Sequence, residues 1–148
     1  MADHTQDVEK KIELVIPMVP KMEMTAVGTA VALAEFMELD TGKIEEMKIA
    51  LIEACINAIE HSKSEERRGY ISFDMGEDAL TIQISDKGHG FSSEEAQKKV
   101  DHRRAQGEQR RGWGLTLMEE MMDDVQIQSS ESGTVLTMVK RRRNSGTW

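Results

Sequence analysis

The spacing of the hydrophobic residues changes along this chain, and that change constrains the fold more than any single residue does. Apolar residues at every second position, typical of a strand with one buried face, predict strands over 11–16, 69–75, 80–84, 125–128 and 134–139. Apolar residues that are dense, or that recur at three- and four-residue steps, predict helices over 22–39, 41–61 and 115–122. Ser92–Glu95 has the form of a capping box and predicts one more short helix. The expected order is therefore β-α-α-β-β-α-α-β-β.

This order predicts a two-layer α/β sandwich, because a sheet and a set of helices with one apolar side each bury those sides against one another. We expect a mixed, mainly antiparallel sheet with the helices on one face. The 148 residues have the size of one domain. We place that domain at residues 11–140, between an N-terminal tail, 1–10, and a basic C-terminal tail, 141–148.

Composition argues against several classes of protein. The chain has 27 acidic and 19 basic residues, four of the latter in the run 140–143, and its net charge of −8 argues against direct binding to nucleic acid. The apolar runs are far shorter than a membrane span, and the N-terminus lacks a signal-peptide pattern. We therefore expect a cytoplasmic chain with no membrane segment. The single cysteine, Cys55, excludes an intrachain disulfide framework.

The first candidate site lies on the helix predicted over 41–61. Glu53, Asn57 and His61 follow one another at four-residue steps and share one side of that helix, with Glu60 beside them. Most of their neighbours are apolar, so a polar row at this place needs a reason. The row is either the solvent edge of the helix or a face turned to a ligand. For a ligand, asparagine and phosphate oxygens together suit Mg²⁺.

The second candidate site follows the strand predicted over 80–84. Asp86 ends that strand, and Gly88 and Gly90 come next. Two glycines around one residue allow positive φ angles and close approach of the backbone to a flat or charged ligand, although a simple turn has the same pattern. An aspartate at this place could accept a hydrogen bond from an exocyclic amine such as that of adenine. The dinucleotide fingerprint and the P-loop are both absent from the sequence.

The third candidate site is the glycine-rich turn from Arg111 to Leu115, where the helix predicted over 115–122 begins. Free backbone N–H groups and the positive end of a helix dipole make such a turn an anion site. The preceding residues 98–111 carry six basic and two acidic side chains. Residues 100–111 have too few apolar side chains to order themselves, which predicts a mobile loop. This loop is either a solvated surface segment or a lid over phosphates, and the lid explains both the charge and the glycines.

In this order the three motifs resemble the ATP-binding boxes of the GHKL superfamily, over about residues 11–140. Within it the chain is similar to the anti-sigma-factor serine kinases, small bacterial regulators of stress and sporulation. The resemblance implies the Bergerat ATP-binding fold, with ATP between helices and sheet under a flexible lid. It implies that Glu53 is the general base and that Asn57 binds Mg²⁺. The nucleotide contacts that it implies are Asn57, Asp86, Gly88, Gly90, Arg111, Gly112, Gly114, Leu115 and Thr134.

Two features of the third motif depart from the family pattern or stay open. Trp113 is bulky for a position between the two lid glycines, Gly112 and Gly114, and could alter how the lid closes. The lid has several arginines, and which of them meets the γ-phosphate is not assigned.

By this resemblance we expect a protein-serine kinase that uses ATP and Mg²⁺, phosphorylates a serine of an anti-sigma-factor antagonist, sequesters a sigma factor and forms a homodimer. The alternative is a non-catalytic switch, in which ATP orders the lid and binding to a partner protein is the whole function. Glu53 favours the kinase, because a pure switch needs no base there. A histidine-kinase catalytic domain is disfavoured, because nothing before Lys11 could form the helical hairpin that accepts phosphate.

Overall fold

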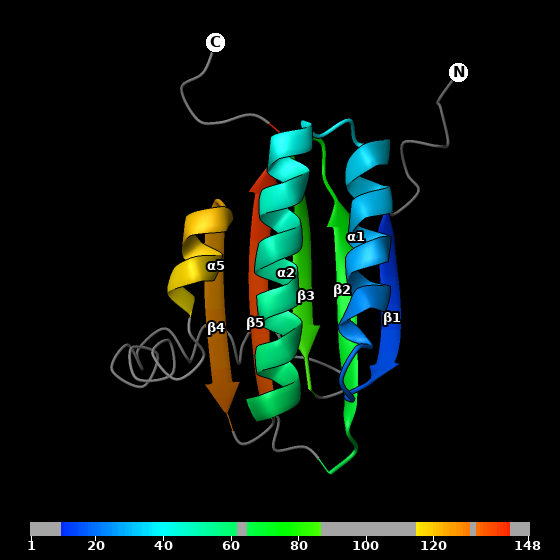
Figure 1. Ribbon diagram of the computed structural model, residues 1–148, viewed down its shortest axis with the longest axis vertical. Coiled ribbons are helices and arrows are strands. Elements are labelled where there is room, and N and C mark those ends of the chain that lie inside the picture. Colours follow the sequence, from blue (N-terminus) through cyan, green and yellow to red (C-terminus); the bar gives the residue numbers. More distant parts are fainter. Residues whose placement is uncertain (1–9, 62–64, 87–114, 131–132, 143–148) are drawn as a thin grey trace, which may run out of the picture.

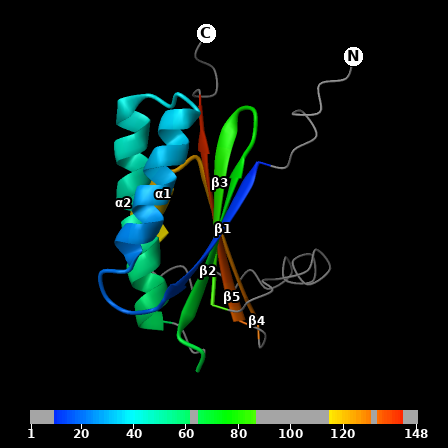
Figure 2. The same ribbon diagram turned by 90° about the vertical axis from the view of Figure 1, so that its right-hand side faces the viewer.

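The computed structural model describes residues 10–61, 65–86, 115–130 and 133–142 of the chain. These residues form two layers, a five-stranded sheet and a layer of helices that covers one of its faces (Figures 1 and 2). The predicted two-layer α/β sandwich is confirmed. Its elements are β1 (Lys11–Pro17), α1 (Glu23–Phe36), α2 (Thr41–His61), β2 (Arg68–Met75), β3 (Ala79–Ser85), α5 (Leu115–Met121), β4 (Asp124–Ser130) and β5 (Gly133–Arg141).

The strands follow the order β1-β2-β3-β5-β4, and all four pairings are antiparallel. We expected a mixed sheet, but among the described strands no pair is parallel. For β1 and β2 the reason is the helical pair between them. α1 runs up the sheet and α2 runs back down (Figure 1), so the chain starts β2 at the end where β1 stopped, and Pro17 pairs with Arg68.

The hydrophobic core lies between the sheet and the helices. Every second strand residue faces the helices, and Phe73, Leu80, Ile82 and Met138 are fully buried there. α2 lies across the middle of the sheet (Figure 1) and packs against α1 on one side and α5 on the other. Burial of each large apolar side chain stabilises the fold by about 1.5–3 kcal/mol. The residues that α2 adds to this core are Met47, Ala50, Leu51, Ala54, Cys55 and Ala58.

α1 ends at Phe36, three residues before the predicted end. Glu38 has a φ of 60°, in the left-handed region. Its N–H donates to the carbonyl of Glu35 at 3.0 Å, and the N–H of Leu39 donates to the carbonyl of Ala34 at 3.0 Å. These two bonds are the Schellman motif, in which glycine normally holds the left-handed position. A glutamate holds it here, so the sequence showed no stop signal.

The apolar side chains of α1 are not all buried. Ala26, Ala30 and Ala34 are fully buried, but Met24 is 55% and Phe36 72% exposed. The cause is the place of the helix, because α1 lies over the β1 and β2 side of the sheet, and among the described helices it packs only against α2 (Figure 1). Its outer side therefore stays open.

Several predicted features lie outside the described residues. They are the short helix at Ser92–Glu95, the loop at 100–111 and the turn at 112–114. The division of the chain into a domain and two tails stays a prediction. In the part of the chain that the structure describes, no helix combines the length and the hydropathy needed to cross a membrane.

Candidate active site

Asp86 directly follows β3 and is buried, with 8% of its surface exposed. Its Oδ1 accepts a hydrogen bond from the N–H of Thr134 on β5 at 2.9 Å. The N–H of Asp86 in turn donates to the carbonyl of Thr134 at 3.4 Å. These bonds continue the β3–β5 ladder one step beyond the Ser85–Val135 pair, so the sheet itself positions the carboxylate. The structure thus joins two residues 48 positions apart that the resemblance assigns to the nucleotide.

The hydroxyl of Thr134 has a partner on the neighbouring strand. Thr134 pairs with Ser129 of β4, and their Oγ1 and Oγ atoms lie 3.1 Å apart. Gly133, with a φ of 132°, starts β5 just before Thr134 and allows the sharp entry into the strand. Sequence analysis missed Ser129, because its place beside Thr134 follows only from the register of the two strands. Asp86, Thr134 and Ser129 form what we call the Asp86–Thr134 corner.

The polar row on α2 does not behave as one exposed edge. Asn57 is buried, with 7% of its surface exposed, and Glu53 one turn earlier is half-buried. Only Glu60 and His61, at the end of the helix, are exposed. The explanation of the row as a solvent edge therefore holds for the last turn alone. A buried amide and a half-buried carboxylate remain on the preceding turns.

The C-terminal end of α2, the end of β3 and the start of β5 all lie at the same end of the molecule, the lower end in Figure 1. This places Asn57 and the Asp86–Thr134 corner at one end of the sandwich. Leu115, the first residue of α5, is buried in the hydrophobic core. It therefore anchors the start of the helix that follows the predicted lid.

Five of the predicted nucleotide contacts, Gly88, Gly90, Arg111, Gly112 and Gly114, lie outside the described residues, as does Trp113. Within the described ranges, no group of three or more His, Cys, Asp and Glu side chains could hold a metal ion.

Lys140 is a buried cation that sequence analysis did not single out. It is 4% exposed, and its Nζ donates to Glu46 Oε1 of α2 at 3.1 Å and to the carbonyl of Met121, the last residue of α5, at 2.5 Å. The sequence placed it in the basic run 140–143. Its alternation with Leu136 and Met138, which also face the core, is the signal that marked it as an inward residue.

Cys55 is buried on α2 and is not placed as a nucleophile. Burial, together with the nearby Glu23 carboxylate, raises the pKa of its thiol to about 12. The reactive form of cysteine is the thiolate, which is scarce at neutral pH when the pKa is this high.

Comparison with known proteins identifies the family. A model described as the histidine kinase-like ATPase domain matches residues 21–140. The serine-protein kinase RsbW of Bacillus velezensis is 35% identical over 136 residues, which cover 87% of this chain and 84% of that protein. The chain belongs to the RsbW family of serine-protein kinases. The predicted family, the anti-sigma-factor serine kinases of the GHKL group, and the predicted enzyme class are thereby confirmed.

Further relatives support the same family. RsbW of Bacillus subtilis is 33% identical over 136 residues, with the same two coverages of 87% and 84%. RsbW of Bacillus cereus is 35% identical over 134 residues, covering 86% of this chain and 82% of that protein. A crystal structure of the RsbU and RsbW domains of a Mycobacterium tuberculosis protein matches 88% of this chain and 32% of that one, with a TM-score of 0.65 at 15% identity. That likeness concerns the fold.

Proposed function

We propose that this member of the RsbW family transfers the γ-phosphate of ATP to a serine of an anti-sigma-factor antagonist, and that it sequesters a sigma factor. Family membership supports the proposal for the whole chain. The observation that carries it is the Asp86–Thr134 corner. There, the strand pairing holds a buried carboxylate at the end of the sandwich that also contains Asn57.

The corner suits an adenine ring. Asp86 presents a carboxylate, the acceptor that an exocyclic amine needs, and the hydroxyls of Thr134 and Ser129 lie close by. In this proposal Gly88 and Gly90 lie beside the base. Arg111, Gly112, Gly114 and Leu115 belong to the phosphate-facing turn and the helix that follows it.

Asn57 and Glu53 suit the reacting end of the nucleotide. Asn57 would bind Mg²⁺ through its amide oxygen, the kind of hard ligand that this ion prefers. When bound, Mg²⁺ neutralises charge on the triphosphate. Glu53 would accept the proton of the incoming serine hydroxyl, which requires a carboxylate that is reachable yet shielded. Its half-buried place on α2 meets that condition.

A matched pair of variants on α2 tests the kinase. Glu53→Gln removes the base, and Glu60→Gln makes the same change at an exposed position of the same helix. Transfer of labelled phosphate from γ-labelled ATP to a serine-containing antagonist should fall by about 10²–10⁴-fold in Glu53→Gln, since a general base contributes that much. ATP affinity should stay close to wild type in both variants, and Glu60→Gln should transfer phosphate normally.

The other outcomes of this assay are equally informative. Transfer at the wild-type rate in Glu53→Gln would place the base elsewhere. A wild-type protein that binds ATP and the antagonist but transfers no phosphate would favour the alternative function, the non-catalytic ATP-gated switch. The bound sigma factor, the homodimer and the use of Mg²⁺ are parts of the proposal that need their own measurements.

A further inference from the structure

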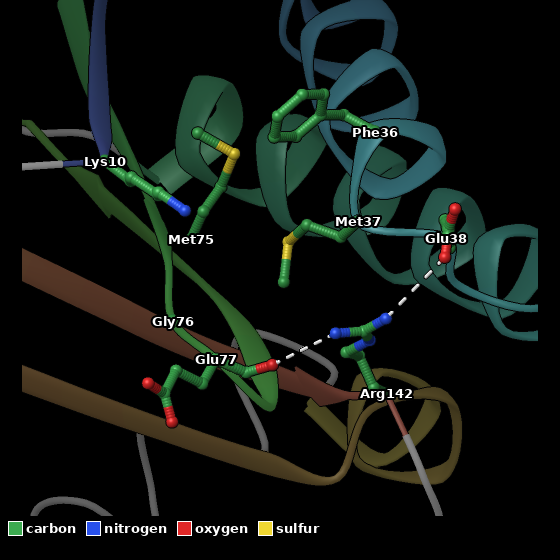
Figure 3. A pocket seen from close by; sticks show the side chains of 8 residues that line it. All are labelled: Lys10, Phe36, Met37, Glu38, Met75, Gly76, Glu77 and Arg142. Atoms are coloured by element: carbon green, nitrogen blue, oxygen red, sulfur yellow. Dashed lines mark hydrogen bonds and ion pairs between the residues drawn. The ribbon is translucent and has the colours of Figure 1, made fainter. Parts of the chain in front are cut away.

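A pocket of about 320 Å³ opens at the upper end of the molecule in Figure 1, opposite the Asp86–Thr134 corner. It lies where α1 ends and where the turn between β2 and β3 meets the end of β5. Figure 3 shows Phe36 and Met37 entering it from α1 and Met75 from β2. A volume of this size is at the lower limit of small-ligand pockets, and holds one aromatic side chain with little else.

The floor of this pocket is apolar and open. Phe36 is 72% exposed, Met75 is half-buried and Met37 is almost fully buried. Two thioethers beside a phenyl ring make an adaptable surface for another aromatic ring. Removing a large apolar side chain from water is favourable, so we expect the exposed ring of Phe36 to contact another apolar group.

The last described residue, Arg142, forms part of the pocket wall. Its N–H donates to the carbonyl of Asp78 at 2.6 Å, and its Nη1 donates to the carbonyl of Glu77 at 3.4 Å. Its Nη2 lies 4.0 Å from Glu38 Oε2 (Figure 3). The chain is therefore fixed at the pocket at the point where residues 143–148 begin.

We propose that the pocket binds the chain's own C-terminal tail, residues 143–148, with the indole of Trp148 on Phe36, Met37 and Met75. Six residues reach at most about 20 Å, which is ample for a segment that starts in the pocket wall. Trp148 is the only large apolar side chain of this tail. The charged side chains that line the pocket are two acidic and two basic ones, so the indole, and not charge, favours this occupant. The tether supplies an effective concentration on the order of millimolar.

The N-terminal segment is the competing occupant within the chain, because Lys10 also lines the pocket. Residues 1–9 contain no phenylalanine, tyrosine or tryptophan. They therefore offer less to the apolar floor formed by Phe36, Met37 and Met75. The C-terminal tail therefore fits better.

Trp148 fluorescence tests the proposal in the full chain, in a Trp113→Phe background that leaves Trp148 as the one tryptophan. We expect emission at shorter wavelength than from a peptide of residues 141–148, with iodide quenching lower by roughly half, since a packed indole exposes far less surface. Phe36→Asp should return both values to those of the peptide. Met24→Asp, at another exposed position on α1 outside the pocket, should change neither.

Measuring the emission at several protein concentrations distinguishes the chain's own tail from the tail of a second copy. Binding within one chain gives a signal independent of protein concentration, whereas a signal lost on dilution means that the tail of a second copy fills the pocket, which overturns the proposal. Peptide-like emission that Phe36→Asp does not alter also overturns it, and leaves the pocket to a partner protein. As a second readout, Trp148→Ala should shift the methyl NMR signals of Met37 and Met75. Unchanged methyl signals would contradict the proposal.

Discussion

The carboxylate of Asp86 is buried, and one of its oxygens accepts a hydrogen bond from the backbone N–H of Thr134. Burying a carboxylate is costly unless hydrogen bonds or a ligand compensate, so a buried aspartate at the end of a strand is a candidate for ligand binding. At the scale of the residue, this buried carboxylate beside Thr134 is the feature that we assign to the nucleotide.

Asp86→Asn tests the role of this carboxylate. The amide keeps an acceptor for the Thr134 N–H, so the fold should survive, but the charge that we propose for binding the adenine amine is lost. We expect ATP affinity to fall by about 10–100-fold, because a hydrogen bond to a charged group contributes roughly 1.5–3 kcal/mol. Calorimetry measures the change, and Asp74→Asn, at an exposed position on β2, serves as the control. Equal affinity in the two variants would remove Asp86 from the adenine pocket.

Cys55 makes a second prediction at this scale, on stability against pH. Its thiol has a pKa of about 12 in the folded chain, raised from 9.0 mainly by burial. Below pH 9 the thiol keeps its proton in both the folded and the unfolded chain, so this group does not make the free energy of unfolding depend on pH. Above pH 9 only the unfolded chain releases it, so stability should fall by roughly 1.4 kcal/mol per pH unit until the folded thiol titrates.

Urea unfolding at pH 8, 9 and 10 measures this slope. Cys55→Ala lacks the thiol and cancels the contribution of every other titrating group when the two proteins are compared. The stability difference between wild type and Cys55→Ala should shrink as the pH rises. A difference that stays constant would mean that the thiol is not shielded from water.

At the scale of the element, the strands and helices followed from hydrophobic spacing, but the places where they meet did not. α1 ends three residues before its expected end, because Glu38, and not a glycine, takes the left-handed position there. Thr134 and Asp86 are joined because β5 lies between β3 and β4, an order that no local pattern reveals. The burial of Lys140 was not predicted, because this residue belongs to the basic run 140–143. Local spacing predicts elements, whereas contacts between distant elements depend on the strand order.

Glu38→Gly tests the account of how α1 ends. A non-glycine residue in the left-handed region costs about 1–2 kcal/mol, part of which glycine gives back through its larger freedom in the unfolded chain. We expect the free energy of unfolding to rise by roughly 0.5–1 kcal/mol. Thermal or chemical unfolding measures it. Ala32→Gly, an exposed position within α1, should instead lower stability by about 0.5–1 kcal/mol. Two variants that change stability in the same direction would contradict the account.

At the scale of the whole molecule, the two ends of the sandwich carry different features. The lower end in Figure 1 holds the Asp86–Thr134 corner and the buried Asn57, and the upper end holds the pocket that we assign to the C-terminal tail. The sheet and α2 span the distance between them. A nucleotide should therefore bind at one end and leave the other unchanged.

The most direct test of this account is a titration of the ¹⁵N-labelled full chain with Mg-ATP, followed by amide NMR. We predict that the largest shifts fall on the backbone amides of Asp86 and Thr134 and on the side-chain amide of Asn57. The amides of Phe36, Gly76 and Arg142 should stay in place. Shifts centred on the upper pocket, or saturating Mg-ATP that leaves Asp86, Thr134 and Asn57 unmoved, would contradict the proposed nucleotide site.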